Sequence, residues 1–213
     1  TAGFIELDQK TPEQFAHLIL ERLAHIEGKP RDHYTKPVPA ITQVLKTSIP
    51  HNLPTLQPFF GREDELKKIA DALDPDTRGW GALIDGPGGM GKTSLAVRAA
   101  YDASPDDFKK IIFISLKSRE LDDDGIRDLS CFLISGLAEL FGELARELGR
   151  DDILKVSEDQ RPRLLIEALR DSQTLLVLDN LESLTKPERD TLFTFVKKLP
   201  TGCKAILTSR GRI

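Results

Sequence analysis

The eight residues Gly86–Thr93 are the feature that most restricts how this chain can fold. Their sequence, GPGGMGKT, matches the pattern G-x-x-x-x-G-K-[ST], which binds phosphate groups. An apolar run at 80–85 precedes the motif and predicts a buried strand, and helix-forming residues follow it at 94–101. A strand that leads through a glycine-rich loop into a helix is the setting in which this pattern binds phosphate. The segment therefore predicts an α/β domain.

The glycines of this phosphate loop and the helix after it explain why the segment suits an anion. Gly86, Gly88 and Gly89 let the backbone wrap closely around phosphate oxygens, and the helix N-terminus adds free N–H groups and a favourable dipole. Lys92 would contact the β- and γ-phosphates, and the Thr93 hydroxyl would ligate Mg²⁺. The predicted nucleoside-triphosphate site in this loop comprises Gly86, Pro87, Gly88, Gly89, Met90, Gly91, Lys92, Thr93 and Ser94.

Composition and charge exclude several other classes of protein. The 213 residues are 39% hydrophobic and 30% charged, which is typical of a globular protein with one α/β domain and an appendage. A net charge of −4 without a basic stripe argues against a nucleic-acid surface. No apolar run is long enough to span a membrane, and there is no signal peptide. Cys131 and Cys203 lie outside any metal-ligand spacing, so we expect buried thiols in a cytoplasmic protein.

The chain divides into three parts by composition. Residues 1–28 contain a short strand predicted at 4–7 and an amphipathic helix predicted at 12–27, which indicate the tail of an upstream effector or adaptor domain. Residues 29–58 carry six prolines, which predict an extended, semi-rigid linker. Residues 59–213 alternate strands with helices, which predicts a parallel sheet covered on both faces. Because the chain lacks an initiator Met and ends directly after a predicted core strand, we expect a fragment of a longer protein.

The third part is predicted to contain the following elements. Strands are expected at 80–85, 110–116, 174–179 and 204–208, and helices at 62–73, 92–103, 126–149 (with a break near Gly136 or Gly142), 160–171 and 187–198. The strand before the phosphate loop is expected to neighbour the last strand, with the 174–179 strand beyond it.

The strand at 174–179 supplies the acid that a phosphate loop needs. Asp179 follows four apolar residues and would lie at the ligand edge of a parallel sheet, where it would hold Mg²⁺ through water. Many such ATPases place a second acid next, to polarise the attacking water, but Asn180 cannot take a proton. Glu182 is a candidate substitute, and a solvated loop carboxylate is the competing interpretation. We therefore expect slow or conditional hydrolysis.

Arg210 follows the last predicted strand. A cation at this position could reach the γ-phosphate and report whether it is present, and an ordinary exposed arginine is the competing interpretation. The predicted catalytic residues are Lys92, Asp179, Arg210 and Glu182, and the predicted Mg²⁺ ligands are Thr93 and Asp179.

Four segments together resemble the signal-transduction ATPases with numerous domains (STAND), the class that includes the apoptotic-protease-activator and plant disease-resistance (NB-ARC) nucleotide-binding domains. They are FFGREDEL at 59–66, the phosphate loop, LVLDN at 176–180 and LTSR at 207–210. They follow that family's order and spacing over roughly residues 58–213. The resemblance implies a three-layer P-loop NTPase core related to AAA+ proteins, with ATP or ADP and Mg²⁺ as ligands.

The resemblance also implies a molecular switch. In the family, ADP holds a closed monomer, and exchange for ATP opens it into an oligomer that activates an attached effector domain. Phe60, Gly61 and Arg62 would line the adenine side, and Arg210 would sense the γ-phosphate. Asn180 departs from the pattern with two acids, although Asp followed by Asn does occur in this class. The implied partners are a nucleotide, further copies of the chain and an effector domain in cis, with the family's small helical and winged-helix domains following residue 213.

Three other functions stay open at this point. A mechanical or loading ATPase of the AAA+ type would act on DNA or protein, and the net acidity and Asn180 argue against it. A non-hydrolysing interaction module would use ATP as a structural ligand, and it differs from a switch only in whether turnover can be measured. A small-molecule kinase has the least support, because nothing resembles an acceptor site or a lid.

Overall fold

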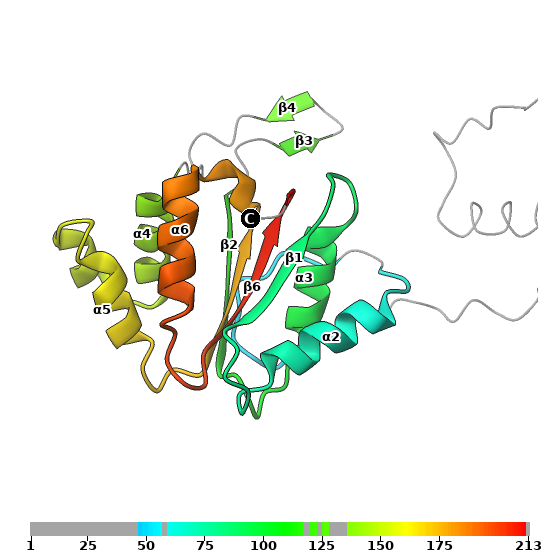
Figure 1. The fold of residues 1–213 in the computed structure, drawn as a ribbon, viewed down its shortest axis with the longest axis horizontal. Coiled ribbons are helices and arrows are strands. Elements are labelled where there is room, and N and C mark those ends of the chain that lie inside the picture. The colour runs from blue at the N-terminus through cyan, green and yellow to red at the C-terminus, as the bar shows by residue number, and fades with distance from the viewer. Residues whose placement is uncertain (1–46, 57–58, 117–119, 123–124, 128–135, 212–213) are drawn as a thin grey trace, which may run out of the picture. The chain divides into compact units, whose positions relative to one another are not determined.

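The computed structural model describes residues 47–56, 59–116, 120–122, 125–127 and 136–211 (Figure 1). The chain separates into two compact units, Thr1–Gln43 and Val44–Ile213, and all described residues belong to the second. The strand and helix predicted within residues 1–28 lie outside the described residues, and so does Cys131.

A four-stranded parallel sheet forms the centre of the second unit. In spatial order its strands are β1 (Gly81–Asp85), β6 (Lys204–Ser209), β5 (Thr174–Asp179) and β2 (Lys110–Ser115). This order confirms the prediction that the phosphate-loop strand neighbours the last strand, with the Asp179 strand beyond it. In the register of the sheet Asp85 pairs with Ser209, and Ser115 pairs with Asp179. Because all neighbouring strands are parallel, their carboxyl ends meet at one edge.

Helices cover both faces of this sheet, as Figure 1 shows. On one face lie α2 (Glu63–Leu73) and α3 (Lys92–Tyr101), and on the other lie α4 (Leu137–Glu147), α5 (Arg161–Ala168) and α6 (Lys186–Val196). Alternate residues of a strand serve the two layers, since Leu175 and Val177 pack with α2 and α3, whereas Leu176 and Leu178 pack on the opposite side. The fold is therefore the three-layer α/β arrangement that the sequence predicts. Short 3₁₀ turns occupy η2 (Asp151–Lys155) and η3 (Leu181–Ser183).

The helix predicted at 126–149 is wrong at residues 126 and 127, residues 128–135 lie outside the described part of the chain, and the predicted break near Gly136 coincides with the start of α4. Residues 126 and 127 belong to β4 (Gly125–Arg127), which pairs antiparallel with β3 (Glu120–Asp122), and α4 begins only at Leu137. The backbone N–H of Leu137 donates to Glu188 Oε1 of α6 at 3.0 Å. A glycine precedes this contact, and a Cβ at Gly136 would lie 3.0 Å from the same oxygen. The start of α4 is thus set by a carboxylate far away in the sequence. The other elements predicted within residues 59–213 are confirmed, with ends that differ by at most one turn.

The predicted linker, 29–58, ends in a segment that packs on the sheet. Residues 47–56 run along the outer edge of β2, where His51 forms a parallel bridge with Ile111. The Asn52 side chain accepts a hydrogen bond from the Phe113 N–H at 2.6 Å and donates one to the carbonyl of the same residue at 3.0 Å. Two side chains of the segment, Ile49 and Leu53, are buried. This end of the predicted linker is therefore part of the domain.

Replacing Glu188 by Gln should destabilise the protein in a pH-dependent way. Hydrogen bonds from the Thr185 hydroxyl, and then from the backbone N–H groups of Leu137 and Thr185, hold the pKa of Glu188 below its ordinary value. The charged Glu188 carboxylate thus caps the N-termini of both α4 and α6. Losing its charge should lower the free energy of unfolding by about 1 kcal/mol. Since the folded pKa is lowered, the contribution is present above the unfolded pKa and is lost as the pH falls through the folded pKa.

Urea unfolding of the wild type and of Glu188→Gln checks this, at neutral pH and at a pH well below 4.5, the ordinary value for glutamate. The exposed Glu158 provides the control variant Glu158→Gln, which should match the wild type at both pH values. A stability difference for Glu188→Gln that stays the same in acid would contradict the charged cap.

Candidate nucleotide-binding site

The phosphate loop joins the end of β1 to the start of α3 at the carboxyl edge of the sheet. Gly91 has a φ of 71°, a conformation that glycine adopts without strain, and the helix begins at Lys92. Nothing lies within 4 Å of the position of a Cβ at Gly86, Gly89 or Gly91. The Lys92 ammonium donates to the carbonyl of Pro87 at 2.9 Å, so its side chain folds back over the loop. Open backbone, a helix N-terminus and a cation together fit a phosphate group.

Asp179 lies at the centre of a cluster of hydroxyl groups. Its side chain is buried at the end of β5, with only 3% of the residue exposed. One carboxylate oxygen, Oδ1, accepts hydrogen bonds from the hydroxyls of Thr93 at 2.7 Å and Thr208 at 2.6 Å. The other, Oδ2, accepts one from the Ser115 hydroxyl at 3.0 Å. The donors belong to α3, β6 and β2, so one carboxylate links the first turn after the phosphate loop to three adjacent strands.

This hydroxyl cluster brings the two predicted Mg²⁺ ligands into contact. Mg²⁺ takes oxygen ligands from carboxylates, hydroxyls and phosphates, so the Thr93 hydroxyl and the Asp179 carboxylate have the required chemistry. Ser115 and Thr208 are not among the site residues predicted from the sequence. A signal for them existed, because each hydroxyl lies in the last two residues of a strand that neighbours the Asp179 strand.

Arg62 contacts the phosphate loop from the segment that precedes α2. Its guanidinium donates a hydrogen bond to the carbonyl of Met90. Gly61 and Arg62 both have positive φ angles, 71° and 64°, so the chain turns sharply before the helix. Phe60 and Met90 are 68% and 53% exposed, which leaves apolar surface next to both ends of this contact. The adenine-side role of residues 60–62 stays a prediction, and the contact places Arg62 at the loop.

Arg210 and Glu182 lie together beside the phosphate loop. Arg210 Nε is 2.7 Å from Glu182 Oε1, and a Cβ at Gly88 would lie 3.9 Å from the same nitrogen. The structure therefore brings both predicted residues to the loop, but it pairs them with each other. Asn180, the residue after Asp179, donates from its side-chain amide to the Ser183 hydroxyl at 2.7 Å.

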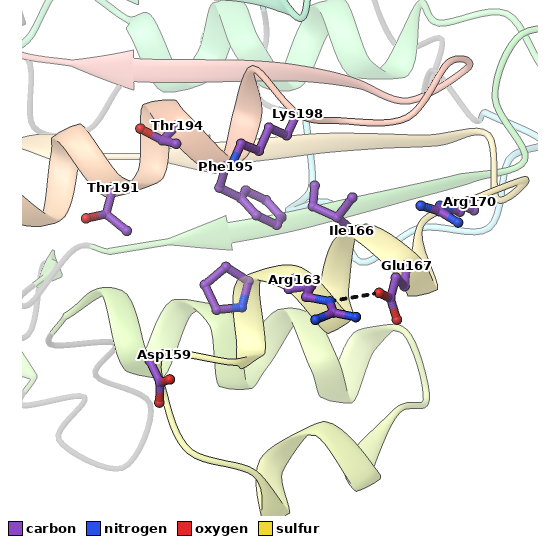
Figure 2. A pocket seen from close by; sticks show the side chains of 10 residues that line it. Asp159, Arg163, Ile166, Glu167, Arg170, Thr191, Thr194, Phe195 and Lys198 are labelled. Atoms are coloured by element: carbon purple, nitrogen blue, oxygen red, sulfur yellow. Dashed lines mark hydrogen bonds and ion pairs between the residues drawn. The ribbon is translucent and has the colours of Figure 1, made fainter.

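A groove of about 460 Å³ lies between α5 and α6, away from this edge of the sheet (Figure 2). Pro162, Ile166 and Phe195 contribute its apolar lining, and Arg163 forms an ion pair with Glu167 at 3.2 Å on its α5 side. None of the predicted site residues lines the groove, so it is separate from the nucleotide site.

Among the described residues, no helix is long and apolar enough to cross a membrane.

Comparison with known families assigns the chain. Residues 58–207 match the family model described as an AAA ATPase domain. The chain therefore belongs to the AAA ATPase domain family. It is an AAA-type nucleotide-binding ATPase domain, and membership of this family implies binding of ATP, typically with Mg²⁺.

One curated relative is the transcription activator GutR of Bacillus subtilis (strain 168), which is 27% identical over 192 residues. The match covers 84% of this chain and 21% of GutR, so the chain spans about a fifth of that relative's length.

Several solved structures are also similar to this chain. A STAND protein with a tetratricopeptide repeat sensor from Pyrococcus horikoshii shares 21% identity, with a TM-score of 0.45 over 75% of this chain and 22% of its own. PCH-2 of C. elegans shares 17% identity, with a TM-score of 0.41 over 70% and 37% of the two chains. A RuvB mutant of Thermotoga maritima shares 17% identity, with a TM-score of 0.34 over 74% and 43%.

Replacing Thr208 by Val tests whether the hydroxyl cluster matters to the fold. The Thr208 hydroxyl donates to Asp179 and accepts the backbone N–H of Asn180 at 2.9 Å. Its loss removes one of the three hydrogen bonds to the buried Asp179 carboxylate and the partner of the half-buried Asn180 N–H. We expect the free energy of unfolding, measured in urea, to fall by about 1–3 kcal/mol. The exposed Thr194, whose hydroxyl bonds within α6, is a matched control, and Thr194→Val should stay within about 0.5 kcal/mol of wild type. Equal effects of the two variants would contradict the role of the cluster.

Proposed function

We propose that this chain is the ATP/ADP-binding switch domain of a multidomain STAND ATPase, in which nucleotide exchange and slow hydrolysis control oligomerisation and activation of an effector domain. The observation that carries the proposal is that two arginines from distant parts of the chain contact or adjoin the phosphate loop. Arg62 bonds to Met90, and Arg210 lies against Gly88. Arginine side chains at the loop can form or lose contacts when the bound nucleotide changes, and each change would move the segment that carries the arginine, before α2 or after β6.

The roles of the loop residues follow from their chemistry. Lys92 would hold the β- and γ-phosphates, and Thr93 and Asp179 would hold Mg²⁺, which neutralises phosphate charge when bound. The hydroxyls of Ser115 and Thr208 keep the buried Asp179 carboxylate in one orientation. Arg62 would fix the loop on the side of the nucleoside, and Arg210 would meet the γ-phosphate.

Slow hydrolysis is supported by the residues that follow Asp179. Asn180 offers an amide where a second acid would polarise water, and an amide takes up no proton. Glu182, the nearby carboxylate, is engaged by Arg210. The same two observations favour the second candidate function, a nucleotide-dependent interaction module without turnover.

The output of the switch is a separate part of the proposal. The B. subtilis relative is named a transcription activator. We propose a transcriptional output for the longer protein to which this domain would belong, with DNA contacts made outside the residues described here.

Lys92→Ala should abolish triphosphate binding while the protein stays folded. Lys92 is half-buried at the first turn of α3, and removal of its ammonium leaves the β- and γ-phosphates without the cation that the loop itself supplies. Calorimetric titration with MgATP measures the affinity, and circular dichroism checks the fold. Lys109→Ala is the control, since Lys109 donates to a loop carbonyl outside the site, and it should bind as the wild type does. Unchanged affinity in a folded Lys92→Ala would defeat the site assignment.

Asp179→Asn should remove the dependence of ATP affinity on Mg²⁺. The amide keeps an oxygen that accepts hydrogen bonds but loses the negative charge that attracts a hard cation. Titrations with ATP, in Mg²⁺ and in EDTA, should give different affinities for the wild type and the same affinity for the variant. A variant that retains the full Mg²⁺ effect would show that the metal is held elsewhere.

A further inference from the structure

The ion pair between Arg210 and Glu182 is a contact that a ligand could replace. Among the described residues, Glu182 is the only hydrogen-bonding or ionic partner of the Arg210 guanidinium, at 2.7 Å. The Arg210 side chain is 62% exposed, so it can move without unpacking the core. Its nitrogen Nε would be 3.9 Å from a Cβ at Gly88, in the middle of the phosphate loop. The guanidinium therefore lies between one protein carboxylate and the place where phosphate groups would bind.

Glu182 is the less exposed member of the pair. Its side chain is 24% exposed, and it belongs to η3, which follows the buried Asp179 almost directly. The second carboxylate oxygen, Oε2, is buried and has no hydrogen-bond partner in the described part of the chain. An unsatisfied charged oxygen is unfavourable, so the carboxylate depends on Arg210 for its stabilisation. The ion pair between Glu182 and Arg210 is therefore favoured over the separated side chains.

We propose that Glu182 determines the preference of this site between ATP and ADP, because it competes with the γ-phosphate for Arg210. This inference rests on the proposed function. ATP brings a third phosphate to the loop, and Arg210 must leave Glu182 in order to meet it. ADP lacks that phosphate and leaves the pair intact. Glu182 therefore lowers the affinity for ATP relative to ADP, and it acts through Arg210 as a positioning residue.

A double-mutant cycle on the 213-residue chain tests the inference. Calorimetric titration with ATP and with ADP, each with Mg²⁺, gives two affinities for the wild type, Glu182→Gln, Arg210→Ala and the double variant. Glu182→Gln keeps the side-chain shape and should raise the affinity for ATP about two- to fivefold, with ADP unchanged. Arg210→Ala should lower the affinity for ATP about tenfold. In the Arg210→Ala background, Glu182→Gln should have no further effect, because no arginine is left to release.

A matched ion pair supplies the control. Glu143 pairs with Arg146 on α4 at 2.7 Å, and Glu143→Gln should leave both affinities unchanged. The inference is overturned if Glu182→Gln lowers the affinity for ATP, changes both affinities equally, or keeps its effect without Arg210. It is also overturned if Glu182→Gln stops hydrolysis at unchanged affinities, which would make Glu182 the base instead.

The affinities of the wild type distinguish a failure of this inference from a failure of the proposed function. A folded wild type that binds neither nucleotide disproves the function, and the inference with it. A wild type that binds both, with a ratio of affinities that Glu182→Gln does not change, disproves only the inference.

Discussion

The carboxylate of Asp179 is the contact on which the arrangement of the site depends. It accepts hydrogen bonds from hydroxyls on the helix after the phosphate loop and on the strands at either side of β5. A buried carboxylate is strongly unfavourable without such partners, so the hydroxyls and the carboxylate need one another. This mutual dependence holds the first turn of α3 close to the strand ends, and it keeps Thr93 and Asp179, the two residues that would hold a metal, in contact.

The parallel sheet is what makes this cluster possible. Parallel pairing brings the carboxyl ends of β1, β6, β5 and β2 to one edge, although the chain reaches them in a different order. The phosphate loop leaves from β1, and Arg210 follows β6 directly beside it, since Asp85 pairs with Ser209. The edge therefore brings together the open backbone of the phosphate loop, an acid and a cation from three separate stretches of sequence. An AAA-type ATPase domain needs such a collection, and membership of that family agrees with it.

Local patterns were enough to predict most of the fold. The apolar runs at 80–85 and 174–179 are strands close to their expected bounds, and the order of three strands follows from the two motifs that they carry. Gly136 was enough to predict a break in the helix near the start of α4, but the contact of Leu137 with Glu188, a residue on another helix, could not be predicted in the same way. Likewise, the prolines predict an extended segment, but they do not predict that residues 47–56 pack against β2. That packing depends on hydrogen bonds between Asn52 and Phe113, which are distant along the chain.

The site residues likewise fall into those that local sequence patterns predict and those that only the fold brings together. The phosphate loop and Asp179 carry their own local signatures, whereas the hydroxyls of Ser115 and Thr208 become meaningful only when the strands are placed side by side. The pairing of Glu182 with Arg210 joins two residues that the sequence offered for separate roles, and only the structure brings them together. That pairing and the amide of Asn180 are the reasons to expect a switch that holds its nucleotide rather than a motor that consumes it.

A single-turnover measurement tests this account most directly. Labelled ATP with Mg²⁺ is mixed with excess protein, and bound nucleotide is separated and identified over time. The account predicts that ATP binds and is converted to ADP at well below about 1 per second, under the usual range for enzymes. Conversion at tens per second, or no binding by the folded chain, would contradict it.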